Sequence, residues 1–326
     1  MSRIPVWRAQ FLALAVVWGS SFLWIKVLGK HWPPIYIALG RVALGAAVLL
    51  VIVLARRTAL PRGRVWGHLA VNAVLMNAGP FTLYAYGEQK VSSVLAGLWN
   101  ATTPLITLVV LVTVMRDERP DRRNLVTLAA GFAGVAVLIA PWNGLGGNAL
   151  IGDVECLGAA VCYGLGGPYT RRFLSGRPES GVALAAAQLS VATGLLAVIA
   201  PIVAAPSLRI EAGTLTAVIV LGVFCSGLAY VLMYAIVRAA GAGTFSTVTY
   251  MIPVVSTALG VIVLGEPLSP NEPVGAVIVL AAMSFSSRSA PSAAPADPAS
   301  GAAQAPVSAS RTADRNSAAT APYRTR

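Results

Sequence analysis

The chain is a succession of long apolar stretches that short clusters of charged residues interrupt. From Phe11 to Lys30 it reads FLALAVVWGSSFLWIKVLGK, in which Lys26 is the only charge before the end. Stretches of roughly 18 to 25 apolar residues have the length that a helix needs to cross about 30 Å of hydrocarbon. The pattern therefore predicts an all-α, polytopic membrane protein embedded in a lipid bilayer.

With the charged clusters taken as boundaries, the chain divides into ten predicted transmembrane helices. The last has the shortest purely apolar core, but Ser269, Pro270 and Glu272 form a helix start signal in front of it. The ten ranges are about 9–29, 34–55, 66–87, 91–115, 124–141, 150–170, 180–204, 213–237, 241–265 and 270–288.

The amino-acid composition also indicates a protein surrounded by lipid. Of 326 residues, 56% are hydrophobic and 11% are charged, whereas an average soluble domain has about 25% charged residues. The chain has too few charged residues to cover the surface of a water-soluble protein of this size. After the last predicted span, residues 289–326 are rich in Ala, Pro, Ser and Thr, a composition that predicts a disordered cytoplasmic tail.

Basic residues are distributed unequally between the connecting segments. If the N-terminus is cytoplasmic, twelve arginines fall in inside loops, and only Lys30, Lys90 and Arg209 fall outside. This positive-inside bias predicts a multi-pass protein of the inner or plasma membrane with both chain ends in the cytoplasm. The net charge of +12 then has a membrane explanation. Because the basic residues do not gather on one surface, nucleic acid is not an expected partner.

Metal and cofactor chemistry find little support in the sequence. His31 and His68 are the only histidines, and the predicted topology places them on opposite sides of the membrane. No spacing of histidine, cysteine and acidic residues is typical of a metal site. We therefore expect neither a metal nor a cofactor.

The chain repeats itself, since residues 84–137 resemble residues 234–285. The aligned pairs are Tyr84 with Tyr234, Pro104 with Pro253, and Glu118 with Glu266. Each half then holds five spans, and an odd number of spans inverts the second copy relative to the first. The expected repeats are 1–144 and 145–288, an arrangement typical of secondary transporters, with the substrate site at the repeat interface.

Several motifs resemble the EamA-type, ten-span members of the drug/metabolite transporter superfamily over about residues 9 to 287. They are Trp18-Gly19-Ser20-Ser21-Phe22 with Lys26, Pro34 with Arg41, the mid-span prolines Pro104 and Pro253, and the turns Glu118-Arg119 and Glu266-Pro267. Asp117 departs from the family, which usually has glycine before this glutamate. The resemblance implies export of small metabolites, amino acids or drugs.

Three charged residues within or beside the spans are candidates for function. Lys26 lies near the outer end of its span and either extends to the headgroups or faces a cavity. Arg41 lies seven residues beyond Pro34, where a guanidinium is costly unless it is paired or hydrated. It is either a cavity residue or a structural anchor. Glu155, at the outer mouth of its span, either pairs with a cation or sits at the interface.

Uncharged polar residues gather in front of the two mid-span prolines. Asn100 and Thr249 each precede their proline, Pro104 and Pro253, by four residues. Proline frees a carbonyl about one turn earlier, which neighbouring polar side chains can satisfy. These residues therefore either satisfy kinked helices or line a cavity at the membrane midplane. The same choice, core packing or cavity lining, applies to the other interior candidates: Trp18, Ser21, Tyr84, Trp99, Tyr163, Tyr230, Tyr234 and Tyr250.

The expected function is a secondary transporter that exports small organic metabolites, amino acids or drugs by alternating access. A membrane-embedded enzyme is the first alternative, but no histidine lies deep in a span and no serine has a GxSxG context. A non-transporting scaffold or sensor is the second. If transport is proton-coupled, Glu155 is the candidate that titrates; otherwise the protein is a facilitator or an exchanger. The sequence leaves the substrate and the oligomeric state open.

Overall fold

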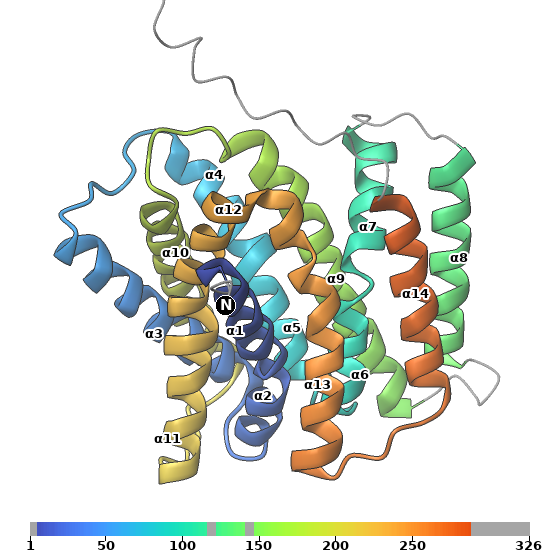
Figure 1. The fold of residues 1–326 in the computed structure, drawn as a ribbon. Coiled ribbons are helices and arrows are strands. Elements are labelled where there is room, and N and C mark those ends of the chain that lie inside the picture. Colours follow the sequence, from blue (N-terminus) through green and yellow to red (C-terminus); the bar gives the residue numbers. More distant parts are fainter. Residues whose placement is uncertain (1–4, 116–121, 141–146, 288–326) are drawn as a thin grey trace, which may run out of the picture. The chain divides into compact units, whose positions relative to one another are not determined.

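The computed structural model describes residues 5–115, 122–140 and 147–287, and every regular element within these ranges is a helix. The all-α prediction is therefore confirmed for the described part of the chain (Figure 1). Glu118, Arg119 and the predicted tail 289–326 lie outside the described residues.

Helices occupy all ten predicted ranges, and several ranges contain more than one helical element. The elements of the first half are α1 (Val6–Gly19), α2 (Ser21–Gly29), α3 (Pro34–Ala55), α4 (Val65–Ala73), η1 (Val74–Ala78), α5 (Gly79–Gly87), α6 (Ser93–Asn100), α7 (Thr103–Val110), η2 (Leu111–Met115) and α8 (Arg122–Ile139). Those of the second half are α9 (Gly147–Phe173), α10 (Gly181–Val203), α11 (Ala212–Ile219), η4 (Val220–Leu228), α12 (Ala229–Ser246), α13 (Val248–Leu264) and α14 (Asn271–Ser287).

Length and composition qualify most of these segments as membrane-crossing. Among the described residues, six helical segments are long and apolar enough to cross a bilayer, and three shorter apolar helices accompany them. Large apolar side chains such as Ile202 and Ile262 are 79% and 81% exposed, which lipid tolerates far better than water. For these three shorter helices and for the remaining range, 66–87, the crossing stays a prediction.

Proline and π-helical turns interrupt the helices near their middles. Pro80 has no N–H to donate, and the wider π-helical turn η1 directly precedes it. In the second half, η4 occupies the matching place between α11 and α12. Before Pro104 the helix breaks between α6 and α7, and the Thr102 hydroxyl donates to the Trp99 carbonyl at 2.7 Å. Pro253, in contrast, lies within the continuous helix α13.

The ninth span begins later than the sequence predicts, and the helical residues of the eighth continue beyond residue 237. Gly241 has a φ of 84° and a ψ of 161°, a non-helical conformation that kinks α12 and separates the long helix before it from a short helical turn after it. Glycine adopts this conformation without the steric cost that a side chain imposes. The helical turn after this kink extends to Ser246, and α13 begins at Val248 rather than at 241.

Close helix pairs bring the two halves together. Helices α8 and α14 lie side by side, as do α3 and α10, and α6 packs on α13 (Figure 1). Between α8 and α14 the backbones nearly touch, because a Cβ on Gly275 would lie 2.6 Å from the Leu138 nitrogen and 2.7 Å from the Gly134 oxygen. Small residues permit such approaches between helices in lipid. The halves therefore share one packed interior.

Candidate functional site

Arg41 is a buried cation at the meeting point of four spans. Its side chain extends from α3 and is 6% exposed. The Arg41 Nε–H donates to the Ser226 hydroxyl of η4 at 2.9 Å, and Nη2 donates to the Ser21 hydroxyl of α2 at 3.4 Å. The guanidinium carbon lies 3.7 Å from the centre of the Phe81 ring of α5. We call these four residues the Arg41 cluster.

The charge of Arg41 has no acidic partner within the described part of the chain. No carboxylate of these residues forms an ion pair with it, and it contacts two neutral hydroxyls and an aromatic face directly. Removing a charge from water is costly unless an opposite charge or several hydrogen bonds compensate. A guanidinium presents five donors in a planar fork that matches a carboxylate. The cluster therefore has the chemistry of an anion site.

A chain of side-chain hydrogen bonds runs among the neighbouring spans. The Thr170 hydroxyl donates to Asn72 at 2.9 Å, and the Asn72 amide donates to Gln188 at 2.6 Å. The Gln188 amide donates to Asn77 at 2.5 Å, and the Asn77 amide donates to the Tyr230 hydroxyl at 3.0 Å. We call these five residues the amide chain. At its Tyr230 end it lies within electrostatic range of Arg41.

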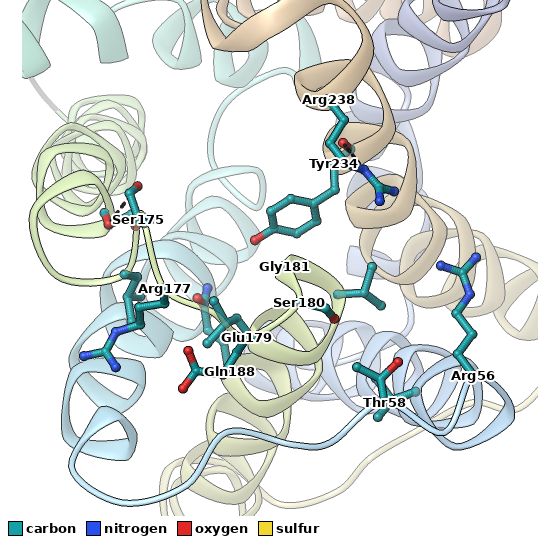
Figure 2. A pocket seen from close by; sticks show the side chains of 16 residues that line it. Arg56, Thr58, Ser175, Arg177, Glu179, Ser180, Gly181, Gln188, Tyr234 and Arg238 are labelled. Atoms are coloured by element: carbon teal, nitrogen blue, oxygen red, sulfur yellow. Dashed lines mark hydrogen bonds between the residues drawn. The ribbon is translucent and has the colours of Figure 1, made fainter. Parts of the chain in front are cut away.

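The other end of the amide chain opens into a cavity of about 490 Å³, which both Thr170 and Gln188 line. This Arg56 cavity lies where α3 and α9 end and α10 begins, an end of the bundle that we call the Arg56 end. Figure 2 shows the Tyr234 ring beside Gly181 at the start of α10. Three cations and one acidic residue line the cavity: Arg56, Arg177, Arg238 and Glu179. The excess of positive charge in this cavity favours an anionic ligand.

A cluster of aromatic rings packs beside the Arg41 cluster. Tyr84 is 2% exposed, and its hydroxyl donates to Asn100 at 3.3 Å. The Phe22 ring meets the Tyr84 ring edge-on at 5.3 Å, and the Tyr163 ring lies 6.3 Å away. Trp99 is 1% exposed and donates its indole N–H to Asp153 at 2.8 Å. The candidates Tyr84, Trp99, Asn100 and Tyr163 therefore pack against neighbouring side chains and do not line the Arg56 cavity.

At the other end, which we call the Lys90 end, α2 and α5 end and α6 begins. Lys26 does not extend into solvent there, because its ammonium donates to the Glu88 and Val91 carbonyls at 2.6 and 2.7 Å. Glu155 pairs with Lys90 at 2.7 Å, and both side chains are about one fifth exposed, at 21% and 22%. Lys26, Lys90 and Glu155 are thus engaged in contacts between helices.

Glu266 joins the two halves at the Lys90 end. Its carboxylate accepts hydrogen bonds from the Ser93 N–H at 3.0 Å, the Ser93 hydroxyl at 2.7 Å and the Val94 N–H at 3.1 Å. These donors form the first turn of α6, where backbone N–H groups lack partners within the helix. Gly265, with a φ of 65°, ends α13 and turns Glu266 toward them.

The remaining candidates lie apart from the Arg41 cluster. Trp18 packs edge-on against Phe245 at 5.9 Å. Thr249 and Tyr250 are half-buried on α13, and Tyr234 lines the Arg56 cavity. The sequence interpretation missed the three amides of the amide chain and Glu88. Polar residues inside apolar runs are the signal that identified Asn100, and the same signal marks Asn72, Asn77 and Gln188.

A helical membrane bundle with an apolar exterior, buried polar groups between its spans and a cavity at one end has the architecture of a membrane transporter. The chain belongs to the EamA-like transporter family, whose model matches residues 7–140 and again residues 150–288. The predicted resemblance is thereby confirmed, and so is the reading as a multi-pass membrane transporter.

Individual relatives agree with the family. The chain is 26% identical over 288 residues to the uncharacterized transporter YvbV of Bacillus subtilis, covering 86% of this chain and 92% of that one. It is 28% identical over 272 residues to the uncharacterized inner membrane transporter YedA of Escherichia coli K12, covering 82% and 86%. It is 26% identical over 284 residues to a probable amino-acid metabolite efflux pump of Salmonella typhimurium, covering 84% and 92%.

A solved structure shares the fold. It is described only as "Crystal structure of protein", has a TM-score of 0.61 and 20% sequence identity, and is matched over 85% of this chain and 95% of its own. At this identity the likeness concerns the arrangement of helices alone.

Proposed function

We propose that this protein is a secondary transporter that works by alternating access and exports small organic solutes with a carboxylate group. The observation that carries this proposal is Arg41, a guanidinium 6% exposed and without an acidic partner among the described residues. A substrate carboxylate would supply the missing charge and accept from the guanidinium fork. The alternative functions, a membrane-embedded enzyme or a non-transporting scaffold, do not explain why a buried guanidinium lacks an acidic partner.

The route to Arg41 supports the same function. An anion that enters the Arg56 cavity meets Arg56, Arg177 and Arg238 first. It then meets Gln188, which lines the cavity and belongs to the amide chain. Amide and hydroxyl groups can replace parts of a solute's hydration shell along this route. On the predicted topology the Arg56 end is cytoplasmic, so the cavity faces the compartment from which an exporter loads.

Inverted repeats of residues 1–144 and 145–288 are part of the proposal, with 289–326 as the tail. Two features support them. The family model matches twice, and the contacts between halves come in swapped pairs: α1 packs on α13 and α12 in one half, and α9 packs on α6, α7 and α5 in the other. Such swapped pairs are what a two-fold exchange of the halves requires.

The substrate class agrees with one relative's description. The Salmonella relative is called a probable amino-acid metabolite efflux pump, and amino acids carry the carboxylate that the Arg41 cluster suits. Small organic metabolites and drugs with a carboxylate meet the same requirement.

Flux in proteoliposomes tests the proposal. The panel pairs leucine, phenylalanine and other amino acids with their carboxamides and adds aromatic cations, each with and without a pH gradient. We expect saturable flux of the carboxylates and little flux of the carboxamides. Equal flux of acids and amides would refute the carboxylate site, and no flux of any panel member would refute export of these solutes.

Gln188 should be indispensable to the buried interior. Replacement by leucine leaves the Asn72 amide and the Asn77 carbonyl without their partner. Each unpaired buried polar group costs about 1 to 3 kcal/mol, so Gln188→Leu should lower the midpoint of thermal unfolding in detergent and reduce flux. Ser190→Ala is the matched control, because that hydroxyl bonds only to Ala186 of its own helix. Equal midpoints for the two variants would contradict the role of the amide chain.

A further inference from the structure

Glu88 is a carboxyl group that neither the fold nor the proposed transport function accounts for. It follows directly after α5, in the connection to α6, and its side chain is 1% exposed. Neither carboxyl oxygen has a hydrogen-bond partner within the described part of the chain. A buried carboxylate ordinarily accepts several hydrogen bonds or pairs with a cation. This one is enclosed without either.

The nearest cation does not neutralise it. Lys26 donates to the backbone carbonyls of Glu88 and Val91, at 2.6 and 2.7 Å, and forms no ion pair with the Glu88 carboxylate. Lys26 thus holds the connection in place while the carboxyl itself stays unpaired. If the carboxyl were ionised in this arrangement, it would be a buried charge whose only compensation came at a distance.

Groups of both signs surround Glu88 from every neighbouring element. Lys26 of α2 and Arg41 of α3 are the cations within electrostatic range, and Glu266 after α13 is the anion. Tyr84 of α5 and Cys156 of α9 are the neutral titratable neighbours. Burial raises the pKa of the Glu88 carboxyl well above its ordinary value, and Lys26 and Arg41 oppose this effect only in part.

We propose that Glu88 is a proton-binding site and that each closure of the Lys90 end takes up one proton there. In the closed arrangement described here the carboxyl is neutral, since it has no partner for a negative charge. When the Lys26 and Glu266 contacts separate, water reaches the carboxyl and it releases the proton. The ligand is a proton from the compartment that the Lys90 end faces.

The sign of the pH dependence follows from this. Below the ordinary glutamate pKa of about 4.3 the carboxyl is neutral in both states, and its contribution to closure is complete. Between that value and the raised pKa of the closed state, opening releases a proton, so the ratio of open to closed protein rises about tenfold per pH unit. Closure is therefore lost progressively as the pH rises through this window.

The test measures the protonation of Glu88 and the closure of the Lys90 end without any substrate. Its outcome is therefore independent of the transport proposal. Infrared difference spectra of the full chain at neutral pH should contain the carbonyl band of a neutral carboxylic acid, and Glu88→Gln should remove it. For closure, a cysteine replacing Val91, which is 6% exposed, is labelled with a maleimide in detergent from pH 5 to 8. The rate is divided by that of Ser207→Cys, an exposed position in the connection between α10 and α11, to cancel the pH dependence of the thiol.

The normalised rate should rise with pH, by up to about tenfold per unit, and Glu88→Gln should abolish the rise because glutamine keeps the shape of the neutral acid. Glu88→Asp should retain a pH-dependent rate. Glu155→Gln is the matched control at the same end, because that carboxylate already pairs with Lys90, and it should leave the rise unchanged. An unaltered acid band in Glu88→Gln, or the same rise in that variant, would overturn the proposal.

Discussion

Arg41→Gln should reduce the flux of carboxylate solutes about 100-fold at low concentration while the protein still inserts and folds. A charge-assisted hydrogen bond contributes about 1.5 to 3 kcal/mol, and about 3 kcal/mol corresponds to two orders of magnitude in affinity. Glutamine keeps a donor for the Ser226 hydroxyl but loses the charge and the fork. Arg41→Lys should recover part of the flux, because an ammonium supplies charge without bidentate geometry.

Flux of each acid and of its carboxamide, with the amount of inserted protein measured in parallel, checks this prediction. Arg57→Gln is the matched control, since Arg57 is exposed and does not line the Arg56 cavity. If Arg41 binds the substrate carboxylate, Arg41→Gln should reduce the ratio of acid flux to amide flux. If acid and amide flux fell equally, Arg41 would be a structural anchor and the proposed site would be wrong.

Glu266→Ala should open the Lys90 end. The substitution leaves the Ser93 and Val94 N–H groups and the Ser93 hydroxyl without their shared acceptor, and it removes a negative charge from the N-terminus of α6. Loss of even one charge-assisted bond of about 1.5 kcal/mol shifts an equilibrium about tenfold. Labelling of a cysteine at Val91 in detergent should therefore accelerate by at least about tenfold.

Ser92→Ala supplies the comparison for Glu266. Ser92 caps the same helix by accepting from the Leu95 N–H at 3.0 Å, but it contacts only its own half through that bond. It should leave the labelling rate at Val91 nearly unchanged, although α6 loses a cap. Equal acceleration by both variants would mean that Glu266 acts on the stability of α6 alone and does not hold the halves together.

Periodicity and charge clusters were sufficient to place the spans, because a helix that crosses lipid must be apolar over a fixed length. They placed the start of the ninth span too early, because the residues after the Gly241 kink carry no charge although α13 begins only at Val248. A run of uncharged residues carries no sign of where the next helix begins, so the start of the ninth span was displaced.

The site was predictable only in part. Arg41 stood out because an arginine is rare so deep in an apolar run, yet its partners Ser226 and Phe81 lie far away in sequence. Lys26 was expected either at the headgroups or facing a cavity, whereas it binds two carbonyls of another span's end. Glu88 looked like an ordinary loop residue, since burial of a residue at a span's end depends on helices that no local pattern specifies.

The composition of the amide chain has a consequence for ion leakage. Carboxamides neither gain nor lose protons at neutral pH, so Asn72, Gln188 and Asn77 cannot pass a proton along by exchanging bonds as water or carboxylic acids do. The three amides stand in series between the Thr170 and Tyr230 hydroxyls. A solute can form and break hydrogen bonds along them, but they interrupt a proton wire, so the buried polar interior does not dissipate the membrane's proton gradient by this route.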